Sequence, residues 1–255
     1  MKNRKWLIFL DFISLAAVFV TNFLAVNLPL NGVTTKQISD SFEIYFVPAG
    51  YVFLIWGVIY LQQLVYLIYR VLPGQRGNKE LASIDGWFVL INLFNVLWLF
   101  SFHYLRFVLA LVFMLLLLAV LIVVFLKLNV GRRRTKLQWR SIVEGTFSVY
   151  LGWISVATIA NVTQLLDYFH WDRFGIAPET WFIFTIVLVV GISAIASFTR
   201  RVFEFNLVLI WALVGIGLKF PHVPLVNYSA WGGAILIAFL GMLALAVPIN
   251  LENHD

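Results

Sequence analysis

The sequence predicts an all-α fold, a polytopic transmembrane helix bundle of about eight spans with both termini cytoplasmic. The first observation behind this is composition: 62% of the 255 residues are hydrophobic and only 12% are charged, against roughly 25% charged in soluble domains. The second is that the apolar residues form long runs, since a hydrocarbon core about 30 Å thick needs about 20 helical residues. The third is the distribution of Lys and Arg between these runs.

The eight spans are separated by proline, glycine, asparagine and basic residues, which end or interrupt helices. We expect the spans at about 6–28, 50–71, 86–104, 106–127, 141–165, 180–199, 203–219 and 229–250. The first follows a basic N-terminus and is longer than a signal-peptide core, so it is expected to be retained. The seventh is the shortest, and we expect it to tilt little or to thin the bilayer locally.

The basic residues support this layout, because cytoplasmic segments carry an excess of Lys and Arg. With both termini cytoplasmic, 14 basic residues fall on the cytoplasmic side: Lys2, Arg4, Lys5, Arg70, Arg76, Lys79, Lys127, Arg132, Arg133, Arg134, Lys136, Arg140, Arg200 and Arg201. Four fall on the other side: Lys36, Arg106, Arg173 and Lys219. The net charge of +6 therefore reflects topology beside an anionic leaflet, and we expect membrane lipid and no nucleic acid as a partner.

One external segment, 29–49, is unusually apolar for a loop. It contains Ile38, Phe42, Tyr45 and Phe46 besides charged residues. Two interpretations stay open: the loop lies in the membrane interface with its aromatic side chains among headgroups, or it forms a lid over a cavity.

Conventional catalytic and metal sites are not indicated. The chain has no cysteine, its four histidines have no metal-ligand spacing, and it has no GxSxG, Walker A or GxGxxG motif. Two ionisable side chains, Asp11 and Glu144, fall inside predicted spans, each within about two turns of the cytoplasmic end. We interpret both as reaching the interface, and this scarcity of intramembrane charge argues against an ion-driven transporter.

Aromatic and amide side chains form one stripe on each of three predicted spans. The stripes are Phe53, Trp56 and Tyr60 in 50–71; Asn95, Trp98 and Phe102 in 86–104; and Trp153, Ala157, Asn161 and Gln164 in 141–165. They favour either an aromatic helix–helix core joined by amide hydrogen bonds or a cavity whose walls hold a large flat apolar ligand. Spacing leaves both open.

Three segments carrying these stripes resemble the TspO/MBR family (tryptophan-rich sensory protein or translocator protein). Residues 48–60, Pro-Ala-Gly-Tyr-Val-Phe-Leu-Ile-Trp-Gly-Val-Ile-Tyr, are similar to its second-helix signature, with departures at Val47 and Tyr51. Asn95-Val-Leu-Trp98 resembles its third-helix Asn-x-x-Trp. Residues 150–161, Tyr-Leu-Gly-Trp-Ile-Ser-Val-Ala-Thr-Ile-Ala-Asn, resemble its fifth-helix pattern, and Val149 replaces the proline before it.

The resemblance covers roughly residues 6–166 and implies a five-helix bundle, residues 1–166, with a pocket beneath the first external loop. It implies a porphyrin or haem-like ligand, or a sterol, bound in that pocket; from the motifs above we expect no catalytic residues, no metal and no cofactor. The implied ligand-binding residues are Trp56, Phe53, Tyr60, Asn95, Trp98, Trp153, Ala157 and Asn161. Trp56 and Trp153 match tryptophans tied in some bacterial members to light-dependent porphyrin breakdown.

Residues 167–255 lie outside the five-helix pattern and are expected to form a C-terminal extension of three further transmembrane helices. A homodimer is left open, although 86–104 lacks the GxxxG-type pattern of closely packed helix pairs. Leu166, Tyr168 and Arg173 fit a loose cholesterol-contact pattern, or else anchor the end of a helix at the interface.

Taken together, these observations predict an integral, multi-pass protein, expected in a bacterial cell membrane. It would bind a hydrophobic ring ligand (tetrapyrrole, porphyrin or sterol-like) as sensor, carrier or scavenger. A permease for a small apolar or zwitterionic solute is the alternative. An enzymatic role would be at most light-dependent porphyrin degradation.

Overall fold

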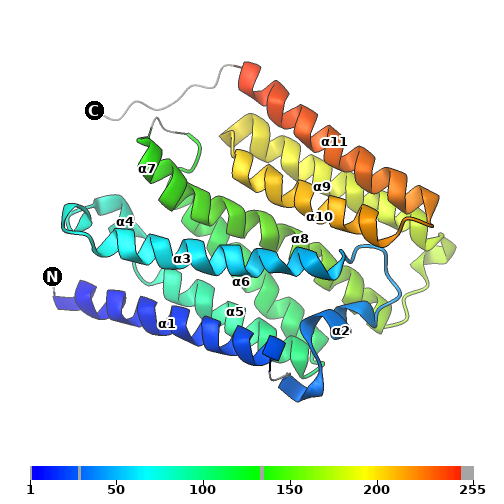
Figure 1. Ribbon diagram of the computed structural model, residues 1–255, viewed down its shortest axis with the longest axis horizontal. Coiled ribbons are helices and arrows are strands. Elements are labelled where there is room, and N and C mark those ends of the chain that lie inside the picture. Colours follow the sequence, from blue (N-terminus) through cyan, green and yellow to red (C-terminus); the bar gives the residue numbers. More distant parts are fainter. Residues whose placement is uncertain (1, 28–29, 133–134, 248–255) are drawn as a thin grey trace.

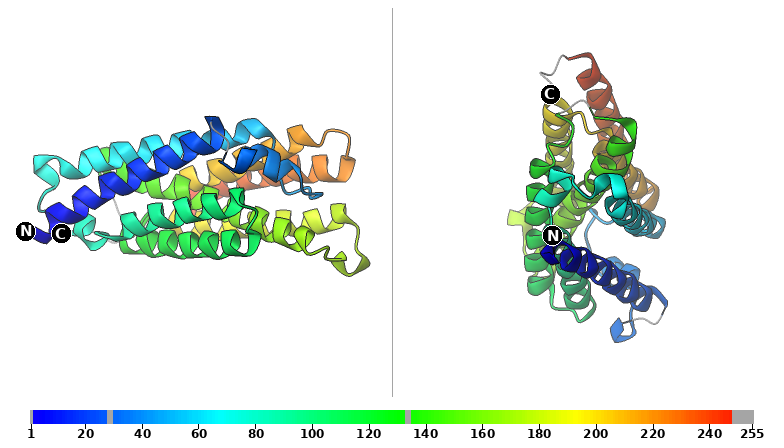
Figure 2. Two further views of the ribbon diagram at one scale, coloured as in Figure 1. Left: turned by 90° about the horizontal axis from the view of Figure 1, so that it is seen from below. Right: turned by 90° about the vertical axis from the view of Figure 1, so that its left-hand side faces the viewer.

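The computed structural model describes residues 2–27, 30–132 and 135–247, and they form an all-α bundle. Eight long helices run back and forth along one axis, so α1 begins and α11 ends toward the same end of the bundle (Figures 1 and 2). They are α1 (Lys2–Asn27), α3 (Ile55–Val71), α5 (Trp87–His103), α6 (Phe107–Lys127), α8 (Gly145–Tyr168), α9 (Pro178–Arg200), α10 (Phe203–Lys219) and α11 (Pro224–Ala246).

The predicted all-α, polytopic fold is confirmed. Within the described residues, six of the eight helices are long and apolar enough to cross a membrane. The other two, α5 and α10, have 17 residues each, or about 26 Å at 1.5 Å per residue. The predicted ends of the first and last spans, residues 28 and 248–250, lie outside the described residues, and the sidedness of the bundle stays a prediction.

The predicted start of the last span at 229 is wrong by five residues, because α11 begins at Pro224. Proline fits the first turn of a helix, where its missing N–H has no intrahelical acceptor, so Pro224 starts the helix and does not precede it. Among the described residues, three short α-helices were not predicted: α2 (Thr35–Asp40), α4 (Lys79–Ser83) and α7 (Leu137–Trp139). The first has a capping box between Thr34 and Gln37, a signal that the sequence does contain.

Helix α8 is the centre of the molecule. It packs against α3 and α6 on one side and against α10 on the other. In the most hydrophobic 18-residue stretch of Leu137–Tyr168, 89% of the residues are buried. Gly152 permits the close approach to α10, since a Cβ there would lie 3.0 Å from the carbonyl oxygen of Phe205. A continuous run of helix, Leu137–Tyr168, leads into and through α8 and includes one π-helical turn at Arg140–Glu144.

Around α8 the helices form two groups. Helices α1, α3, α5 and α6 lie on one flank, and α9, α10 and α11 pack mainly on one another on the opposite flank (Figures 1 and 2). Helix α10 joins the second group to α8. This arrangement leaves α8 with one face toward α3 and α5 and another toward α9.

The two charged residues expected at the interface are buried instead. Asp11 is 0% exposed and forms an ion pair with Arg70 of α3, which also pairs with Asp85. Glu144 is 6% exposed and accepts hydrogen bonds from the Gly131 N–H and the Thr135 hydroxyl. The interpretation that these side chains reach the interface is therefore wrong, because the sequence did not reveal which segments would supply their partners.

Candidate functional site

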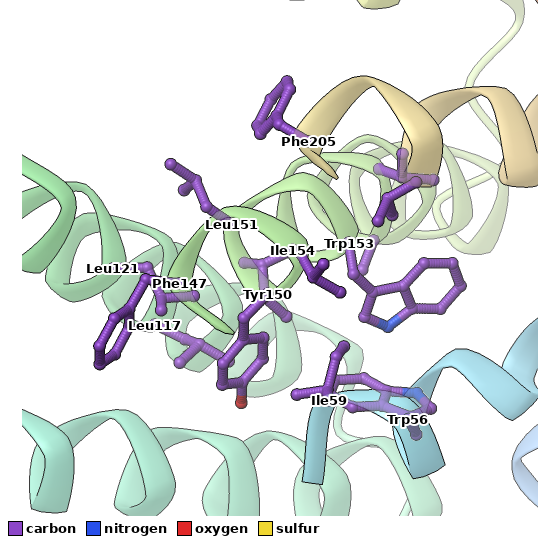
Figure 3. Close-up of a cluster of buried hydrophobic side chains, with 14 of the residues drawn as sticks. Trp56, Ile59, Leu117, Leu121, Phe147, Tyr150, Leu151, Trp153, Ile154 and Phe205 are labelled. Carbon is purple, nitrogen blue, oxygen red and sulfur yellow. The ribbon is translucent and has the colours of Figure 1, made fainter. Parts of the chain in front are cut away.

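Three helices bring their tryptophans to one place, as the stripes predicted. Trp56 of α3 stacks on Trp98 of α5 with ring centroids 5.5 Å apart, and meets Trp153 of α8 edge to face at 5.9 Å. Figure 3 shows Trp56 and Trp153 next to each other between α3 and α8, with Tyr150 beside them. We call Trp56, Tyr60, Trp98, Tyr150 and Trp153 the aromatic cluster.

Amide side chains complete the hydrogen bonding of this cluster. The Asn95 side chain accepts from the Tyr60 hydroxyl (3.4 Å) and donates to the Tyr150 oxygen (2.9 Å). The Trp98 indole donates to Asn161 Oδ1 (3.1 Å), and Asn161 Nδ2 donates to the Ala157 carbonyl (2.8 Å). Two buried asparagines therefore hold aromatic rings of three helices in fixed orientations.

One fully buried polar atom of the cluster has no partner among the described residues. The indole nitrogen of Trp153 is buried and finds no acceptor among the described residues, although the side chain is only 3% exposed. A buried donor without a partner costs about 1–3 kcal/mol. An acceptor atom placed beside Trp153 would recover that cost.

All eight predicted site residues belong to this neighbourhood. Phe53 packs edge to face on Trp153 at 6.1 Å, and the others are linked by the contacts above. The three stripes meet, as both interpretations of their spacing require, but they do not meet around an open pocket. The rings contact one another directly, so in this structure the cluster is an aromatic core joined by amides, and its role in ligand binding stays a prediction.

The apolar external loop packs on the end of the bundle. We call residues 30–49 the lid. Ile38, Phe46 and Val47 are buried, and an aromatic ladder runs from the cluster to the lid through Trp98, Phe102, Phe107 and Phe42, with neighbouring ring centroids 5.0–5.9 Å apart. The loop is thus packed on protein rather than spread among headgroups.

The lid also joins the two groups of helices. On the first group, Thr35 bonds to His103 of α5 at 2.9 Å, and on the central helix α8, Gln164 donates to Ser39 at 3.3 Å. On the second group, Tyr45 donates to Glu179 of α9 at 2.8 Å, and Asp40 pairs with Lys219 of α10. Movement of the lid would therefore break contacts with both groups at once.

The Asp40 pair predicts a pH effect on the lid. Partial burial raises the pKa of Asp40, but hydrogen bonds from Lys219 and Lys36 outweigh it and hold the pKa below its ordinary value. The stabilisation is therefore present above about pH 3.9 and is lost as the pH falls through the lowered pKa. Because the pair is partly exposed, we expect an effect of at most about 1 kcal/mol.

Pepsin cleavage within residues 35–47 would measure this opening. The Asp40→Asn variant lacks the ion pair at every pH. As the pH falls below about 4, we expect the cleavage rate of the wild type to rise toward that of the variant, until the two rates are equal. At pH 5 the variant should be cut faster than the wild type. Equal cleavage of both proteins at all pH values would show that the pair does not hold the lid.

A cavity of about 880 Å³ lies on the other face of α8, between α6, α8 and α9. We call it the α9 groove. None of the eight predicted site residues lines it. Apart from Asp167 at one end, its α8 wall is Leu151, Ser155, Thr158, Ile159, Val162, Thr163 and Leu166. The hydroxyls of Ser155 and Thr158 bond to the Leu151 and Ile154 carbonyls of their own helix, so the wall is effectively apolar. No local sequence signal marks this groove, because it arises from how α9 sits against α6 and α8.

The fold and the cluster define the class of protein: an integral, multi-pass α-helical membrane protein whose aromatic, amide-linked core lies beneath a loop that packs on one end of the bundle. A family model described as TSPO-like protein matches residues 7–243. The chain therefore belongs to the TSPO-like protein family. The match also includes the three C-terminal helices, which lie outside the five-helix resemblance. Searches among curated proteins and among solved structures gave no match.

Proposed function

We propose that this protein binds a flat hydrophobic ring compound of the tetrapyrrole or sterol-like class at the aromatic cluster, as a sensor, carrier or scavenger. The observation that carries the proposal is the meeting of three indoles from three helices beneath the lid, with the Trp153 N–H left without an acceptor. Aromatic walls with a few oriented polar groups are typical of sites for apolar ligands.

The closed cluster sets a condition on binding. Trp56 contacts Trp98 and Trp153 directly, so a ring ligand has to take the place of one of these ring contacts. Each aromatic pair is worth about 0.5–1.5 kcal/mol, and a ligand ring replaces it with a contact of the same kind. The remaining cost is the opening of the cluster and lid, which the ligand has to supply through its preference for the open state.

Protoporphyrin IX is the probe that tests the proposal. We expect the double variant Trp56→Phe, Trp153→Phe to raise its Kd at least about tenfold, equivalent to about 1.4 kcal/mol, because both walls lose area and the unpaired N–H is removed. The measurement is the porphyrin absorbance during titration of purified protein, which does not depend on the number of tryptophans.

A matched control removes two indoles elsewhere. Trp6 and Trp231 are 63% and 37% exposed, and Trp6→Phe, Trp231→Phe should leave the Kd unchanged. If both double variants bind protoporphyrin IX as tightly as the wild type, the aromatic cluster is not the site.

A further inference from the structure

Among the described residues, the α9 groove, on the face of α8 opposite the aromatic cluster, is lined by charged side chains only at its ends. One end carries Arg132 and Arg200, and the other carries Glu43, Asp167 and Arg173. At the second end Arg173 is paired with Asp167 at 3.2 Å. The groove is thus basic at the end where α6 and α9 finish and mixed in charge at the other.

The basic end is built by a loop that packs on the last turn of α9. The guanidinium of Arg200 donates to the Val130 carbonyl (3.5 Å) and lies 5.8 Å from the centroid of the Phe125 ring. Arg132 follows two residues after Val130 in the same loop. Glu144 is bonded to the Gly131 N–H behind this loop and is not among the residues that line the groove.

The groove opens toward the hydrocarbon of the membrane. Leu126 of α6 and Leu188 and Ile195 of α9 line it and are 50%, 51% and 67% exposed. An occupant can therefore enter sideways from the bilayer without passing the lid.

The length of the groove along α9 fits an acyl chain. Thr199 and Leu188 both line it and lie 11 residues apart on α9, a rise of about 16 Å. One leaflet of a bilayer contributes about half of a hydrocarbon core about 30 Å thick. The half of the groove next to the arginines is thus as long as the acyl region of one leaflet.

We propose that the basic half of the α9 groove is a binding site for an anionic phospholipid, with its headgroup phosphate at Arg132 and Arg200 and an acyl chain between α6, α8 and α9. Basic pockets between transmembrane helices recognise anionic headgroups in this way. The arginines belong to the side predicted to be cytoplasmic, where the leaflet carries the anionic lipids. The site is separate from the aromatic cluster and does not depend on the ring-ligand proposal.

Lipid retention after purification tests the site. The protein would be reconstituted in vesicles of phosphatidylcholine and phosphatidylglycerol in equal amounts, extracted with detergent and examined by native mass spectrometry. We expect the two arginines to give a preference for phosphatidylglycerol of roughly tenfold to thirtyfold, equivalent to about 1.4–2 kcal/mol. We expect Arg132→Gln, Arg200→Gln to reduce this preference to about twofold or less.

Two further variants separate the site from general charge attraction. Arg76→Gln, Lys79→Gln removes the same charge from exposed positions just before α4 and at its first residue, and should keep the preference; α4 lies at the end of the bundle where α6 and α9 finish (Figure 1). Ala196→Trp, on the α9 wall of the groove, should reduce retention of both lipids while melting at the wild-type temperature. An equal loss of preference in both double variants, or full retention in Ala196→Trp, would overturn the proposal. Trp56→Phe, Trp153→Phe should retain phosphatidylglycerol normally whatever its porphyrin affinity.

Discussion

Arg70→Met is expected to lower the free energy of unfolding by about 3–5 kcal/mol, the usual cost of removing one partner from a buried ion pair. The Arg70 side chain is fully buried and pairs with Asp11 of α1 and with Asp85, which precedes α5. Its removal leaves the carboxylate of Asp11 enclosed between helices with no cation beside it. Loss of the charge that joins these segments should also loosen α1.

The measurement is unfolding by heat or denaturant in detergent micelles, followed by circular dichroism. Arg76→Met changes an exposed arginine at the same end of the bundle and should cost less than about 1 kcal/mol. Removing the Asp11 charge together with the arginine, as in Arg70→Met, Asp11→Leu, should recover part of the loss, because the carboxylate is then no longer stranded. A single variant as stable as Arg76→Met would mean that Arg70 has access to water and is not buried.

The helices could be predicted from the sequence because residues that end or interrupt helices flank each apolar run. The segment 203–219 was predicted and found with identical bounds, since a basic pair precedes it and a proline follows closely. Pro224 was misread because a proline near a helix end is compatible with a break or with the first turn. The capping box at Thr34 and Gln37 could have predicted α2, but a six-residue helix leaves no period to detect.

The aromatic cluster was predictable for a different reason. Trp56, Trp98 and Trp153 each lie on a stripe with polar neighbours, and in a bundle such stripes face inward. The closeness of the rings was not predictable, because a stripe does not determine the distance between helices. The Arg70 pair and the α9 groove also depend on which helices become neighbours, and a single sequence contains no local signal for that.

Gly131→Ala is expected to destabilise the protein by about 2–5 kcal/mol, the sum of a backbone strain and a collision. Gly131 has φ +73°, where a residue with a side chain costs about 1–2 kcal/mol. A Cβ built there would also lie 1.7 Å from the carbonyl oxygen of Arg200. Since that atom is backbone, the loop and the end of α9 would have to separate.

Gly32→Ala adds the backbone strain without the collision, because Gly32 has nearly the same φ, +75°, with nothing within 4 Å of an added Cβ. The difference in unfolding free energy between the two variants, measured in one detergent, is the cost of parting the loop from α9. Because Arg132 and Arg200 sit on the two sides of that contact, Gly131→Ala should also reduce phosphatidylglycerol retention, whereas Gly32→Ala should not. Equal destabilisation by the two variants would mean that the loop and α9 can move apart freely, and the basic end of the groove would then have no fixed geometry with which to hold a headgroup.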